Sequence, residues 1–141
     1  MSASRKNQWL TVVLFGAVYL TVGVFFPNPS ATDKSQFIWR LAAWAICALA
    51  FAIHIGLEHF RFRNSLSWIA LHAALAVAFG ALGLAAAANI HGYTTGTGRP
   101  VLLALALVLW PLITGAPAFL AAFVLAAVLA QIKKDARSAA S

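Results

Sequence analysis

The chain has 141 residues, of which 62% are hydrophobic and only 9% charged, against about 25% charged residues in an average soluble domain. A water-soluble protein of this size has too much surface to bury so many apolar side chains. The net charge of +7 does not indicate nucleic-acid binding, because the basic residues lie at the chain ends and between apolar runs. The lipid bilayer must therefore act as solvent for much of the chain.

Four apolar runs predict an all-α, polytopic transmembrane bundle of four helices that forms a single domain, residues 1–141. The runs cover residues 9–26, 37–57, 66–88 and 101–130. About 20 residues cross the hydrocarbon core, so each of the first three runs is long enough for one crossing. A secretory signal cleaved at 27–31 is the alternative for the first run. That run is longer than the usual apolar core of about 7–15 residues, which favours an uncleaved helix.

The fourth run is too long for one upright crossing, and it contains Pro111 and Pro117. Proline removes a backbone donor and clashes with the preceding turn. The run is therefore predicted to form a tilted helix kinked at the prolines. A short outer segment followed by a separate span is the alternative.

The distribution of basic residues predicts the orientation. Seven lie at the two chain ends and in the gap between the second and third runs, and three lie on the opposite side. The seven are Arg5, Lys6, Arg61, Arg63, Lys133, Lys134 and Arg137; the three are Lys34, Arg40 and Arg99. Because basic loops stay in the cytoplasm, we expect a multi-pass protein of the cell (inner) membrane with both termini cytoplasmic.

Small residues mark the faces on which helices can approach closely in lipid. They recur at steps of three and four in the third run, and smaller groups occur in the first and fourth. These residues are Gly16 and Gly23; Ala73, Ala76, Gly80, Gly83 and Ala87; and Gly115, Ala118 and Ala122. Packing within the chain is the first interpretation of these faces. A homo-oligomer or a larger membrane complex is the second.

Ionisable residues inside the apolar runs are candidates for chemistry, because charges are costly to bury in a membrane. Glu58, the only glutamate, closes the second run, and His54 precedes it by one turn on the same face. His72 lies in the third run, which returns after a short turn. We expect His54, Glu58 and His72 to meet near the cytoplasmic end of this hairpin. The residues expected around them are His59, Arg61 and Arg63.

The face of the second run that carries His54 and Glu58 should point into the bundle along its whole length. Traced backwards at steps of three and four, this face comprises Phe51, Cys47, Trp44 and Arg40. The single cysteine has no second thiol with which to form an internal disulfide. Its place in an apolar run predicts a small hydrophobic packing role.

Several functions fit the expected cluster of His54, Glu58 and His72. The histidines can hydrogen-bond Glu58 and pin the hairpin together. They can be axial ligands of a b-type haem, with the arginines pairing its propionates. The three residues can also bind a divalent metal, or form a proton relay or a quinone-headgroup site.

The sequence favours a non-catalytic membrane module or accessory subunit whose surroundings are the lipid bilayer. No serine or cysteine nucleophile has a histidine at a spacing typical of hydrolases, which argues against an enzyme. A haem- or metal-binding redox protein that uses His54, Glu58 and His72 is the alternative. An oligomeric small transporter is a third reading, and it would need several copies to build a path.

Overall fold

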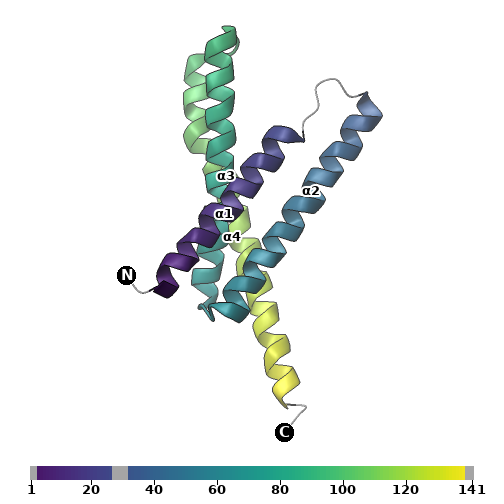
Figure 1. Ribbon diagram of the computed structural model, residues 1–141, viewed down its shortest axis with the longest axis vertical. Helices are drawn as coiled ribbons and strands as arrows, with labels where there is room; N and C mark the ends of the chain where they lie inside the picture. The colour runs from purple at the N-terminus through teal and green to yellow at the C-terminus, as the bar shows by residue number, and fades with distance from the viewer. Residues whose placement is uncertain (1–2, 27–31, 139–141) are drawn as a thin grey trace.

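The computed structural model describes residues 3–26 and 32–138, and every regular element in these ranges is helical (Figure 1). The elements are α1 (Ala3–Phe25), α2 (Asp33–Gly56), the π-helical turn η1 (Leu57–Arg61), α3 (Leu66–Thr95) and α4 (Pro100–Ser138). Four helices are long and apolar enough to cross a membrane, which confirms the prediction of four candidate spans. The alternative of a signal cleavage falls at 27–31, outside the described residues.

The helices extend beyond the apolar runs that predict them. The third apolar run ends at residue 88, but α3 continues to Thr95 and ends at Gly96, whose φ of 66° is left-handed. The hydroxyls of Thr94 and Thr95 donate to backbone carbonyls of the preceding turn. Hydropathy places these ends wrongly because a helix is defined by its backbone hydrogen bonds and not by apolar side chains.

α4 is one continuous helix through Pro111 and Pro117. In Figure 1 its lower part leans away from the line of its upper part. The hydroxyl of Thr114 donates to the carbonyl of Trp110 at 2.8 Å, close to the two prolines. The alternative of a short segment followed by a separate span is therefore wrong.

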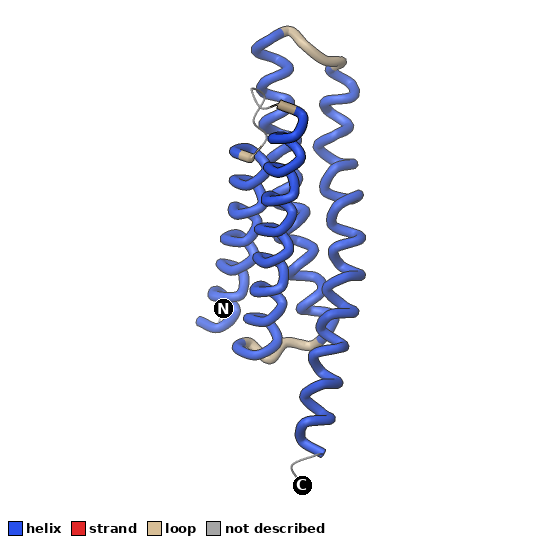
Figure 2. Tube along the Cα trace, turned by 90° about the vertical axis from the view of Figure 1, so that its right-hand side faces the viewer, coloured by secondary structure: helices blue, strands red, loops and turns tan. Residues whose placement is uncertain are grey.

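α3 is the central helix of the bundle. It packs along α4 on one side, and α1 crosses it on the other (Figures 1 and 2). α1 and α2 lean away from the α3–α4 pair toward their upper ends (Figure 1). The start of α1, the α2–α3 turn and the end of α4 all lie toward the lower end of the molecule (Figures 1 and 2).

Only the C-terminal half of the predicted inward face of α2 is buried. His54 and Glu58 are fully buried and Phe51 is partly buried, but Trp44 is 78% exposed and Arg40 is also exposed. The prediction of an inward face along the whole helix is thus wrong for its N-terminal half. The reason is that α2 diverges from α3 and α4, so its first turns have few neighbours (Figure 1).

Glycines permit the close crossing of α1 and α3. A Cβ added at Gly80 would lie 2.6 Å from the Tyr19 Cβ and 3.1 Å from the Gly16 carbonyl oxygen. A Cβ added at Gly16 would lie 2.5 Å from the Phe79 ring and 3.1 Å from the Ala76 carbonyl oxygen. These glycines are already used in the contact between α1 and α3, so a second copy or another partner would have to use other surfaces.

The crossing predicts opposite effects for two glycine substitutions. Gly80→Ala should lower the free energy of unfolding by about 1–3 kcal/mol, because its methyl group meets the backbone and Cβ of α1. Gly56→Ala is the matched control, since a Cβ there has nothing within 4 Å. Alanine at 56 should be neutral or stabilise by up to about 1 kcal/mol through helix propensity. Reversible unfolding in detergent micelles measures both, and equal effects would contradict the assignment of the crossing.

Candidate functional site

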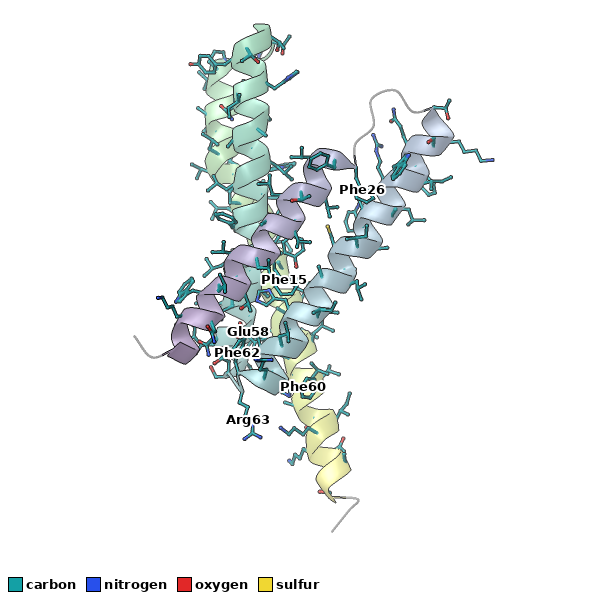
Figure 3. The ribbon with its side chains drawn as sticks, viewed as in Figure 1. Phe15, Phe26, Glu58, Phe60, Phe62 and Arg63 are labelled. Atoms are coloured by element: carbon teal, nitrogen blue, oxygen red, sulfur yellow. The ribbon has the colours of Figure 1, made fainter. Side chains whose placement is uncertain are left out.

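The structure brings the three predicted residues together at the lower end of the bundle. Glu58 lies in η1 with no exposed surface, and Figure 3 places it beside the lower part of α1. His54 comes from the last turn of α2 and is fully buried, and His72 comes from α3 and is 2% exposed. These three residues and Asn64, which joins them from the α2–α3 turn, are called the Glu58 cluster below.

Both oxygens of the Glu58 carboxylate have partners within the chain. His72 Nδ1 lies 3.1 Å from Oε1, and His54 Nε2 lies 3.7 Å from the same oxygen. The side-chain amide of Asn64 donates to Oε2. The Thr11 hydroxyl is 3.5 Å from Oε1, but its nearer acceptor is the Gln8 carbonyl at 2.6 Å. His72 and Asn64 are therefore the main hydrogen-bond partners of the carboxylate.

The π-helical turn explains how Asn64 reaches Glu58. The amide of Phe62 donates to the Leu57 carbonyl five residues earlier, at 3.2 Å, as in a π-helix. The backbone amide of Asn64 then donates to the backbone carbonyl of Glu58 at 3.3 Å. Asn64 thus contacts both the backbone and the side chain of Glu58. Gln8 of α1 in turn donates to the Asn64 side-chain oxygen at 3.2 Å, which extends the network to a third helix.

Aromatic rings enclose both imidazoles. The His54 ring stacks on Phe15 of α1, with centroids 4.5 Å apart and planes inclined by 3°. The His72 ring has Trp9 at 5.5 Å and Trp68 at 5.4 Å. The apolar rings keep the surroundings of the carboxylate low in dielectric constant, which strengthens its hydrogen bonds. Both ring nitrogens of His54 lie beyond hydrogen-bond distance of any partner in the described residues.

The expected outer residues do not contact the carboxylate. His59 is partly buried and packs edge-on against Phe60, with ring centroids 4.9 Å apart. Arg61 and Arg63 are exposed, and Figure 3 shows Arg63 directed away from Glu58. Asn64, Gln8 and Thr11 stand where these residues were expected.

Sequence reasoning overlooked these three partners. Gln8 and Thr11 were detectable as polar residues three apart at the start of an apolar run. Asn64 gave no signal beyond its place in the turn. Its contact depends on the π-helical geometry of η1, which no residue pattern in this segment indicates.

The geometry is that of a hydrogen-bonded cluster. Across residues 3–26 and 32–138, no group of three or more His, Cys, Asp or Glu side chains is arranged to hold a metal ion. The two imidazoles meet at one carboxylate oxygen, whereas axial ligands of a haem must face each other across the iron. As placed, the cluster can accept, donate and hold a proton, and it can fix three helices relative to one another.

Comparison with protein-family models, with curated proteins and with solved structures finds no match to this chain. The chemistry of the Glu58 cluster must therefore be argued from its own geometry.

The role of Asn64 can be tested on the stability of the protein. Asn64→Ala removes the donor to Oε2 and should lower the free energy of unfolding in micelles by about 1–3 kcal/mol, since a buried acceptor is left unpaired. Thr94→Ala is the control, because the exposed Thr94 hydroxyl bonds only to its own helix backbone. The control should change stability by less than about 0.5 kcal/mol. A loss no larger than that of Thr94→Ala would show that Oε2 does not depend on Asn64.

Proposed function

We propose that this chain is a non-catalytic module of the cell (inner) membrane that serves as an accessory subunit of a larger membrane assembly. The observation that carries the proposal is that both oxygens of the buried Glu58 carboxylate have partners within the chain. The carboxylate is satisfied by α3 and the α2–α3 turn, with further support from α1. No substrate is needed to complete these contacts. The cluster then acts as a clasp that gives a small bundle one defined shape.

The proposed orientation places both termini and the α2–α3 turn in the cytoplasm. It is supported by the seven basic residues on that side against three on the other. The common position of the helix ends at the lower end of the bundle fits an even number of crossings (Figure 1). With the C-terminus in the cytoplasm, a reporter enzyme that folds only in the cytoplasm should be active when it is fused to that end. A C-terminal reporter that is active only on the outer side of the membrane would show the reverse orientation.

The cost of burying the Glu58 carboxylate favours a structural role for the Glu58 cluster, in which it holds the helices together. Burying a carboxylate costs several kcal/mol unless hydrogen bonds and opposite charges replace its water. His72 and Asn64 supply hydrogen bonds here, and the Trp9 and Trp68 rings beside His72 keep water away. Because the partners come from different elements, the carboxylate loses them as soon as the elements separate. The cluster thus makes separation of α1, α2 and α3 costly.

A haem- or metal-binding redox protein remains the second candidate, and one observation favours it. The buried ring nitrogens of His54 have no hydrogen-bond partner in the described structure, so a lone pair is available for a ligand. His72 and Glu58 would have to move to join His54 around a metal ion, since no three such side chains in the described ranges are arranged to hold one. For an oligomeric transporter, no comparable observation exists.

The two candidates differ in what the purified protein binds. Detergent-purified chain is analysed for bound metal and by absorption spectroscopy, and is then titrated with haemin and with Zn²⁺ to restore any lost cofactor. The accessory-module proposal predicts a colourless, metal-free protein and no saturable binding of either additive. His91→Ala is the matched control, because His91 is exposed at the other end of α3. Binding that His54→Ala or His72→Ala abolishes and His91→Ala preserves would overturn the proposal in favour of the redox protein.

A further inference from the structure

The end of η1 and the turn that follows it present two arginines beside aromatic rings. The residues 60–63 read Phe-Arg-Phe-Arg. Arg61 and Arg63 are exposed, Phe60 is 60% exposed and Phe62 is half-buried. Figure 3 shows Arg63 extending below the bundle and Phe60 lying on the side of the turn nearest to α4. The turn therefore combines free cationic groups with an exposed apolar ring.

The arginines remain free although a buried carboxylate lies close in the sequence. The side chains of His54 and His72 lie against the Glu58 carboxylate in the described chain, and neither arginine takes part. The other described acid on this side, Asp135, accepts a hydrogen bond from Gln131 at 3.3 Å. Among the side chains that the structure describes, no carboxylate pairs with Arg61 or Arg63. Their guanidinium groups are available to an anion from outside the chain.

The backbone holds the arginines in this outward position. Arg61 is the last residue of the π-helical turn η1, and Arg63 has a φ of 53°, the left-handed region that L residues with side chains rarely adopt. Unfavourable backbone conformations of this kind are maintained by surrounding contacts and concentrate at functional sites. Here the two backbone bonds that Phe62 and Asn64 make to Leu57 and Glu58 maintain them.

We infer that Arg61, Arg63 and Phe60 form a binding site for the headgroup of an anionic phospholipid. The guanidinium group matches phosphate oxygens with two parallel N–H donors, and an exposed aromatic ring is favoured at the depth of the headgroups. The position of the turn at the ends of two candidate spans brings it to that depth. The exposed Lys133 and Lys134 near the end of α4 add positive charge on the same side.

A lipid is favoured over a soluble anion or an acidic protein by the place of the turn. The exposed Phe60 ring needs an apolar environment next to the charged groups, and the membrane interface offers both at once. The inference rests on the proposed membrane location and orientation. It does not depend on the structural role of the Glu58 cluster. The results of the haemin and Zn²⁺ titrations therefore neither support nor contradict the lipid site.

The test compares lipid binding to the full-length chain in a neutral detergent. Dioleoylphosphatidylglycerol and dioleoylphosphatidylcholine are titrated separately, and native mass spectrometry counts the lipid retained. The wild-type chain should prefer phosphatidylglycerol. Arg61→Gln/Arg63→Gln should weaken phosphatidylglycerol binding by roughly 30-fold, the loss expected for two arginines near an anionic surface.

The matched control removes the same charge from the opposite side. Arg40→Gln/Arg99→Gln should keep the preference, because both arginines lie at the other end of the chain's spans. An equal loss in the two double variants would overturn the site in favour of diffuse charge attraction. Equal binding of the two lipids by the wild type would also overturn it, and so would inorganic phosphate that displaces phosphatidylglycerol at millimolar concentration.

A second measurement needs no variant and guards against a double variant that fails to fold. Phosphatidylglycerol binding to the wild-type chain should weaken steadily as salt is raised from about 0.01 to 1 M, while phosphatidylcholine binding stays constant. A salt-independent preference for phosphatidylglycerol would contradict recognition by exposed arginines.

Discussion

The hydrogen bonding of one carboxylate inside an apolar bundle is the constraint on which the rest of the structure depends. Glu58 cannot exchange its partners for water without moving the helices, because its whole surface is covered. Its contacts reach α3 through His72 and the α2–α3 turn through Asn64. Since a buried charge that loses a partner costs several kcal/mol, these elements are held in one arrangement.

The close crossing of α1 and α3 and the Glu58 cluster support each other. Gly16 and Gly80 let the two backbones meet, and Thr11 and Phe15 of α1 then lie next to the carboxylate and the His54 ring. On α3, His72 lies eight residues before Gly80, or about 12 Å along the helix. A wider crossing would move α1 away from the cluster and expose the imidazoles. Packing by small residues and the polar contacts thus specify the same geometry.

The sequence predicted the parts of the fold and site that depend on a single helix. Four apolar runs indicated four helices, and the spacing of His54 and Glu58 placed them on one face of the second run. The sequence did not predict the contacts that α1 makes with the cluster, because the approach of Thr11 and Gln8 depends on how α1 crosses the bundle. The prediction that Trp44 points into the bundle was wrong for a related reason. A helix in lipid can be apolar on every side, so its pattern does not tell which side has a protein neighbour.

Glu58 and His72 are expected to hold the bundle together through their direct contact. A double-mutant cycle with Glu58→Gln, His72→Gln and the double variant, followed by reversible unfolding in micelles, measures the energy of that contact apart from the cost of each substitution. A coupling of at least about 1 kcal/mol is expected between the two positions, as for a buried hydrogen bond to a charged group. Effects that add to within about 0.5 kcal/mol would contradict it, because the two side chains would then stabilise the protein independently.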